Sequence, residues 1–369
     1  MKKVIQVLVA ILISSSSILA QDIKPHRPQE PQKPYPYYSE DVRFKNQQAE
    51  IHLAGTLTLP KKEGVFPAVI LITGSGPQNR NEELAGHKPF LVLSDYLTKN
   101  GIAVLRYDDR GTAMSEGNFN SATSADLAGD VESAVAYLKT RKEIDPKKIG
   151  LIGHSEGGLI APLVAVQSKD IAFIVMLGGP GIPGDKILQI QQRLIAEVSG
   201  VSKAEIKGTE RINKKIFDIV KKSSDIEQLK IDLKSNLQKF LNENPDFKKP
   251  GNMTADEFIH LQIETYATPW MQYFIRYNPV NTLKKVRIPV LALNGEKDLQ
   301  ITPKENLNAI KKALRKAGNR NMTIMELPDL NHLFQESDTG APQEYQKIEQ
   351  TYAPTVLKEV LHWLKIQVK

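Results

Sequence analysis

Unbroken runs of apolar residues recur along this chain, separated by stretches of mixed polarity. The runs lie at 68–72, 102–105, 149–152, 171–177 and 289–293. Runs of this kind are typical of parallel strands that are buried on both faces of a sheet. Two further strands are predicted at 51–59, where apolar and polar residues alternate, and at 322–327.

The stretches between these runs have the spacing of amphipathic helices. After a capping Thr123, apolar residues recur three or four positions apart: Leu127, Val131, Ala134, Val135 and Leu138. Other helices are predicted at 89–100, ended by Gly101, at 303–317, ended by Gly318, and at 345–366, interrupted by Pro354. Strands that alternate with helices indicate βαβ units and a mostly parallel sheet.

Residues 184–273 interrupt this alternation. They contain no buried-strand run and consist of helical segments rich in lysine and glutamate. We therefore predict a core in two parts, 38–183 and 274–369, with a helical insertion between them. On a catalytic sheet such an insertion would be a cap over the site, and a mobile one; the alternative is a solvated helical decoration.

The N-terminal residues have the features of a secretory signal. Lys2 and Lys3 precede an apolar stretch at 4–13 and small residues up to Ala20, after which we expect cleavage. The protein is then exported, periplasmic or secreted, without stable membrane insertion; an uncleaved anchor helix is the alternative. Residues 21–37, with five prolines, are predicted to be an extended linker.

Composition narrows the class of function. The chain has 369 residues, no cysteine and a net charge of +7. Disulfides and thiol catalysis are therefore excluded. The lysines are scattered and lack interleaved aromatic residues, so we expect no nucleic-acid partner. The sequence gives no indication of the oligomeric state.

Candidate chemistry is concentrated at the motif Gly153-His154-Ser155-Glu156-Gly157. It directly follows the strand at 149–152 and precedes a helical pattern. A serine on a sharp turn between a strand and a helix has its hydroxyl pushed out of the sheet, and the flanking glycines permit that turn. Ser155 is the candidate nucleophile.

A serine hydroxyl needs a base, and His332 is the best placed of the seven histidines. It follows the last short strand, at the edge of the sheet that Ser155 also occupies. Asp298, in the loop after the strand at 289–293, is the candidate carboxylate that orients the imidazole, and Glu296 is its rival. The order Ser155, Asp298, His332 is the one expected of an α/β-hydrolase fold.

The developing oxyanion needs backbone donors. One is the N–H of Glu156, directly after the nucleophile; the other is expected from the glycine-rich loop after residue 72, with Ser75 as first choice and Gly76 as second. Gly76 and His154 are also candidate substrate contacts. The segment 108–111 contains an aspartate–arginine pair that is expected to brace the elbow. No cluster has metal-ligand spacing, so we expect neither metal nor cofactor.

Five segments together resemble exported bacterial α/β hydrolases, similar to esterases and to the serine aminopeptidase-like branch: 74–78, 106–111, 153–158, 294–298 and 331–334. The resemblance implies the nucleophile, acid and base named above, and acyl transfer to water. The chain departs from the pattern at Asn79, Asn81 and Ala113, where the family often has aspartate or glycine.

The leading functional hypothesis is a carboxylesterase that cleaves short-chain acyl esters of small molecules. A serine aminopeptidase or amidase with the same three residues is the alternative, and a non-catalytic binding protein is a remote one. At the end of the predicted cap, Trp270 and Tyr273 are candidate substrate contacts, although aromatic residues at this spacing are more often part of a core.

Overall fold

The computed structural model describes residues 26–369 and divides them into two compact units. One consists of residues 183–277, and the other joins 26–182 with 278–369. The predicted signal at 1–20 lies outside the described residues. Within 26–369, no helix is long and apolar enough to cross a membrane.

The larger unit is built on one eight-stranded sheet, with the order β1-β2-β4-β3-β5-β6-β7-β8. From β4 onward all neighbouring strands are parallel, whereas β1 and β2 run antiparallel at one edge. This is the mostly parallel sheet that the alternating pattern predicts. The strands are β1 (Tyr38–Asn46), β2 (Ile51–Leu59), β3 (Phe66–Ile72), β4 (Ala103–Tyr107), β5 (Ile144–His154), β6 (Phe173–Leu177), β7 (Val290–Gly295) and β8 (Met322–Leu327).

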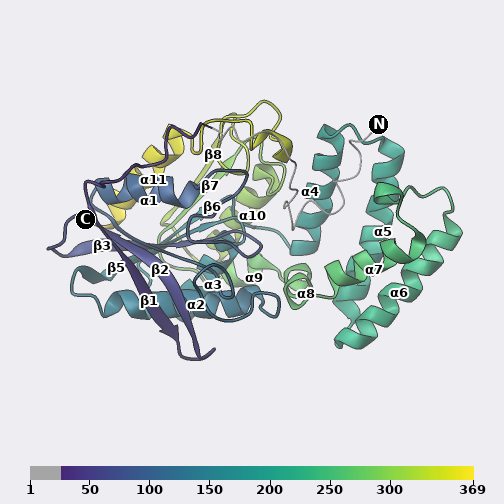
Figure 1. Ribbon diagram of the computed structural model, residues 1–369, viewed down its shortest axis with the longest axis horizontal. Coiled ribbons are helices and arrows are strands. Elements are labelled where there is room, and N and C mark those ends of the chain that lie inside the picture. Colours follow the sequence, from purple (N-terminus) through teal and green to yellow (C-terminus); the bar gives the residue numbers. More distant parts are fainter. Residues whose placement is uncertain (1–25) are drawn as a thin grey trace. The chain divides into compact units, whose positions relative to one another are not determined.

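Helices cover both sides of this sheet (Figure 1). They are α1 (Pro89–Lys99), α2 (Ser124–Lys139), α3 (Gly157–Gln167), α9 (Pro279–Leu283), α10 (Pro303–Lys316) and α11 (Pro354–Gln367), with a 3₁₀ turn at Pro342–Glu344. The predicted cap at Thr123 is present, because its hydroxyl accepts the N–H of Asp126 while the Asp126 carboxylate accepts the N–H of Thr123. Gly101 and Gly318, which follow α1 and α10, both have positive φ, as their predicted role requires.

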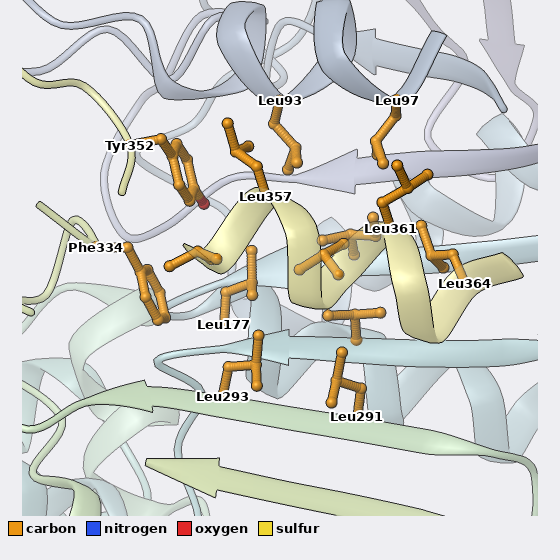
Figure 2. Close-up of a cluster of buried hydrophobic side chains, with 14 of the residues drawn as sticks. Leu93, Leu97, Leu177, Leu291, Leu293, Phe334, Tyr352, Leu357, Leu361 and Leu364 are labelled. Carbon is orange, nitrogen blue, oxygen red and sulfur yellow. The ribbon is translucent and has the colours of Figure 1, made fainter. Parts of the chain in front are cut away.

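A large cluster of buried hydrophobic residues lies between the sheet and the pair α1 and α11. Figure 2 shows leucines of both helices directed toward leucines of β6 and β7, among them Leu177, Leu291 and Leu293. All three strand leucines are at most 1% exposed. Burial on this scale stabilises the sheet by roughly 1.5–3 kcal/mol for each large side chain. The carboxyl ends of the parallel strands are thereby held at fixed spacing.

The smaller unit is entirely helical among its described residues. It contains α4 (Gly184–Val198), α5 (Lys203–Lys222), α6 (Ile226–Glu243), α7 (Ala255–Tyr266) and α8 (Pro269–Arg276), with a 3₁₀ turn at Pro250–Asn252. Its own core includes Phe217, Leu233 and Phe258, each at most 1% exposed. The sequence predicted helices without strands over nearly the same residues.

Residues 26–37, which belong to the predicted extended linker, are held against the larger unit by hydrogen bonds. The Arg27 guanidinium donates to carbonyl oxygens of residues 85, 86, 346 and 348, at 2.7–3.1 Å. The Gln29 amide donates to the carbonyl of Tyr352 and accepts the N–H groups of Thr351 and Tyr352.

The helix expected at 345–366 forms only from Pro354 onward. Between 345 and 353, several backbone groups bind side chains instead of one another. The Tyr345 carbonyl faces His87 Nε2 at 2.8 Å, and the Gln350 carbonyl accepts from Gln335 at 3.0 Å. Since Arg27 and Gln29 take further groups of this segment, the backbone has no need of helical hydrogen bonds.

Candidate active site

Ser155 lies on the turn between β5 and α3, as the motif predicts. Its φ is +52°, a left-handed conformation that is strained for a residue with a side chain. The turn is held because the Ser155 N–H donates to the carbonyl of Leu177 at the end of β6, at 2.8 Å. A Cβ on Gly153 would lie 2.0 Å from a backbone oxygen, and one on Gly157 2.1 Å from another. Only glycine therefore fits on either side of the serine.

His332 and Asp298 are brought into direct contact by the loops after β8 and β7. His332 Nδ1 lies 2.8 Å from Asp298 Oδ2, and both side chains are almost completely buried. The other carboxylate oxygen of Asp298 accepts the N–H groups of Gln300 and Ile301, both at 2.8 Å. Asn294 Nδ2 adds a contact of 3.2 Å to Oδ2. These bonds fix the orientation of the Asp298 carboxylate that contacts the imidazole.

Glu296, the rival acid, points elsewhere. It is exposed, and its carboxylate accepts the N–H of Asp329 at 3.0 Å. The geometry thus gives Asp298 the contact with His332. Because Nδ1 faces a carboxylate, the neutral imidazole carries its proton there and presents Nε2 as the basic nitrogen.

The nucleophile and the base flank the same strand end. The ring of His332 lies against Gly178, where an added Cβ would come within 3.3 Å of it, and Gly178 directly follows the residue that holds Ser155. Within residues 26–369, neither Ser155 Oγ nor His332 Nε2 has a hydrogen bond. The contact needed for proton transfer is therefore not yet made in this structure, and such contacts often tighten only when substrate binds.

The expected oxyanion loop lies beside Ser155. A Cβ on Gly74 would be 3.2 Å from the Cβ of Ser155, so the backbone preceding Ser75 passes directly over the nucleophile. Asp109 braces this loop by accepting the Thr73 hydroxyl at 2.9 Å and the Gln78 N–H at 2.9 Å. Burial raises the pKa of the Asp109 carboxyl well above its usual range, against the lowering effect of these two bonds.

The segment 108–111 was expected to brace the elbow, but it holds other parts of the unit. Asp109 binds the loop just described. The guanidinium of Arg110 pairs with Asp130 on α2 at 2.7 Å, and Asp108 pairs with Arg80 at 2.7 Å. Each charge therefore finds its partner in a neighbouring loop or helix rather than beside the serine.

His154 was a candidate substrate contact, and the structure contradicts this. Its ring is 5% exposed, and both nitrogens face protein groups: Nδ1 lies 2.9 Å from Glu82 Oε1, and Nε2 lies 2.9 Å from the carbonyl oxygen of His332. A buried ring whose two nitrogens both face protein groups has no polar atom left for a substrate. Glu82 itself was missed, because nothing in the sequence distinguishes it from Glu83 next to it.

The other candidate residues lie in different environments. Gly76 is buried and has φ +93°, a backbone conformation that favours glycine. Glu156 has its side chain buried, accepting the Ser124 hydroxyl at 2.6 Å, while its backbone follows Ser155. Trp270 and Tyr273 belong to the helical unit.

The two aromatic candidates take part in ring stacking within α8 and its end. Trp270 stacks on Phe274 with ring centroids 5.2 Å apart, and Tyr273 stacks on Tyr277 at 5.5 Å. Trp270 is 6% exposed, as expected for a core residue. Across the described part of the chain, no group of three or more acidic or histidine side chains could hold a metal ion.

Comparison with known proteins gives related families and folds. A family model described as serine aminopeptidase, S33 matches residues 88–338, which include Ser155, Asp298 and His332 but not Glu82. Esterase EstD from Thermotoga maritima is 26% identical over 332 residues, covering 89% of this chain and 69% of that protein.

Two solved structures share the fold at lower identity. The α/β hydrolase GrgF from Penicillium sp. sh18 has a TM-score of 0.54 at 17% identity, covering 89% of this chain and 99% of its own. The Pyrococcus furiosus esterase Pf2001 has a TM-score of 0.53 at 17% identity, covering 89% of this chain and 91% of its own. At this identity the likeness shows the fold alone, an eight-stranded hydrolase sheet flanked by helices.

Proposed function

The chain belongs to the serine aminopeptidase S33 family of α/β hydrolases, and from this premise we propose that it is a carboxylesterase with Ser155 as nucleophile. The observation that carries the proposal is the buried contact of 2.8 Å between Asp298 and His332 at the strand end that also holds Ser155. The relationship to esterase EstD over most of the chain supports ester hydrolysis.

The reaction begins when Ser155 Oγ attacks the ester carbonyl carbon while its proton passes to His332 Nε2. Asp298 stabilises the imidazolium that results. The carbonyl oxygen becomes an oxyanion, whose binding we assign to the N–H groups of Glu156 and Ser75. The intermediate then collapses, and the leaving alcohol takes the proton from His332, which leaves the acyl group on Ser155.

The second half of the reaction regenerates the enzyme. Water enters, gives a proton to His332 Nε2 and attacks the acyl carbon. A second oxyanion forms in the same place and collapses, releasing the carboxylic acid, while the proton returns to Ser155 Oγ. All the protein groups needed are contributed by residues 75, 155, 156, 298 and 332 of the larger unit.

The substrate we propose is a small-molecule ester with a short acyl chain. The description of the family as serine aminopeptidases favours a second candidate, hydrolysis of an aminoacyl amide by the same three residues. That activity would need a carboxylate placed to bind a free amino group. A non-catalytic binding role would appear as a failure to react with a fluorophosphonate probe.

The test is hydrolysis of p-nitrophenyl acyl esters from acetate to decanoate by the protein and by its Ser155→Ala variant. Turnover that is lost in the variant, with a maximum at short acyl chains, is the expected result. Turnover that persists in the variant would contradict the role of Ser155. If no ester reacts but aminoacyl anilides do, the amidase candidate replaces the esterase.

We also propose that the protein is exported, with residues 1–20 removed. The apolar segment at 4–13 and the small residues before Gln21 support export. N-terminal sequencing of protein from the periplasm or medium should begin at Gln21.

A further inference from the structure

We propose that Glu82 and His154 form a charged positioning pair, which sets the distance between the oxyanion loop and the base His332. The proposal rests on the proposed ester hydrolysis. Neither residue touches the substrate, so each acts through a neighbour: Glu82 through Gly74 and His154 through the backbone of His332.

The contacts form one continuous path through the site. Glu82 Oε1 accepts the Gly74 N–H at 2.6 Å and faces His154 Nδ1 at 2.9 Å. His154 Nε2 faces the His332 carbonyl oxygen at 2.9 Å. Glu82, His154 and His332 are each at most 5% exposed, so water does not compete for these bonds. One carboxylate oxygen therefore links the loop over the nucleophile to the residue that accepts its proton.

Counting protons gives the charge of the pair. A carbonyl oxygen can only accept, so His154 Nε2 must carry a proton, and the carboxylate opposite Nδ1 also calls for a donor. A neutral imidazole has one N–H, whereas these contacts need two. The structure is satisfied by an imidazolium facing a carboxylate. The short bond from Gly74 to the same oxygen favours an ionised Glu82.

Electrostatics around the pair agrees with this count. Burial by itself would lower the pKa of His154, but the Glu82 carboxylate, the bond to the His332 carbonyl and the more distant Asp298 outweigh it and raise this pKa above its usual value. Other titratable groups nearby are His332, whose ring centroid is 4.8 Å away, and Tyr352, whose pKa burial raises out of the working range.

The consequence for catalysis is a pH dependence with two limbs. On the acid side, activity requires His332 Nε2 to be unprotonated. On the alkaline side, loss of the second proton from His154 breaks one end of the path and lets the two loops move apart. The ester carbonyl is then held less well between donors and nucleophile. We therefore expect the alkaline limb in kcat rather than in KM.

The decisive variant is Glu82→Gln. An amide oxygen can still accept from both Gly74 and His154, so the shape is kept and only the charge is removed. We expect the alkaline limb of kcat to move toward acid by at least about one pH unit, with activity below that limb within about threefold of the parent. Glu83→Gln is the matched control, because Glu83 is the exposed neighbour and has no contact with His154.

A profile of Glu82→Gln that coincides with those of the parent and of Glu83→Gln would overturn the proposal. So would a lower melting temperature with an unchanged profile, since the pair would then be purely structural. A second measurement needs no variant to fold: in ¹⁵N-histidine NMR spectra of the parent at pH 7, both ring nitrogens of His154 should be protonated. One unprotonated nitrogen would contradict the charged pair, even if the protein hydrolysed no ester.

Discussion

Two histidine–carboxylate pairs lie side by side in this site, and they use their histidines in opposite ways. In the pair of Asp298 and His332, one ring nitrogen is bound and, among the described residues, the other has no hydrogen bond. In the pair of Glu82 and His154, both nitrogens are bound to protein groups. A histidine can act as a base only through a nitrogen that the protein leaves available, which is why we propose catalysis for the first pair and positioning for the second.

The largest effect should come from breaking the catalytic pair. Asp298→Asn keeps the shape of the side chain but allows an N–H to face His332 Nδ1, which favours the wrong tautomer. We expect kcat on a short p-nitrophenyl ester to fall by about 10⁴-fold. Glu296→Gln, two residues away and turned to the Asp329 N–H, should stay within about threefold of the parent. Equal losses in both variants would argue against Asp298 as the acid.

Breaking the pair of Glu82 and His154 should mainly lower the stability of the fold. His154→Phe leaves the buried Glu82 carboxylate without its cation, which is expected to lower the free energy of unfolding by about 3–5 kcal/mol. His52 and Glu116 form a similar pair at 3.1 Å that is half exposed to solvent. His52→Phe should therefore cost about 1 kcal/mol or less. Urea unfolding of both variants gives the comparison, and similar losses would show that burial of the pair is unimportant.

Loosening the catalytic carboxylate without removing it should have a smaller effect. Asn294→Ala removes the 3.2 Å contact to Asp298 Oδ2 and the bond from Nδ2 to the Ile301 carbonyl, while the two backbone N–H bonds to Oδ1 remain. Loss of the bond that orients Asp298 is worth about 1–1.5 kcal/mol, which corresponds to about a tenfold drop in kcat. If kcat is unchanged while KM rises, Asn294 acts on binding instead.

The smallest expected effect is a change in how the free energy of unfolding depends on pH, and it concerns the pair of Glu82 and His154. His154 has a raised pKa in the folded protein, so the stability it contributes is fully present below the pKa of an unfolded histidine, about 6.5, and is lost as pH rises through the folded value. The free energy of unfolding of the parent should therefore decline more steeply above this pH than that of Glu82→Gln. If the free energy of unfolding of the two proteins depended on pH in the same way, the pair of Glu82 and His154 would not be charged.

The difference between the pairs also separates what the sequence predicts from what it does not. The Asp298 and His332 contact follows from the order of strands, because each residue lies in the loop after a predicted parallel strand and the ends of such strands meet at one edge. Glu82 lies beyond the glycine-rich loop that follows β3, 72 residues from His154. No local sequence pattern relates the loop carboxylate of Glu82 to the ring of His154. This pair can therefore be recognised only from the three-dimensional structure.

The same reasoning applies to the fold. Buried parallel strands were predicted because their apolar runs are continuous, whereas β1 was not, because its outward positions are polar and only Val42 and Phe44 are buried hydrophobic residues. The expected helix at 345–353 failed for a different reason. Its spacing is helical, but contacts with residues 27, 29, 87 and 335 bind its backbone, and such tertiary competition leaves no sign in the segment itself.

The contacts of Arg27 and Gln29 also affect the order in which the larger unit folds. Their partners lie up to 323 residues further along the chain, so these bonds close nearly the longest loop the chain can form. Contacts of such separation contribute only after most of the chain is ordered, and they slow folding accordingly. On a ribosome, the larger unit cannot complete this closure until residues 346–352 have emerged, and until then Arg27 can bind only the carbonyl oxygens of residues 85 and 86.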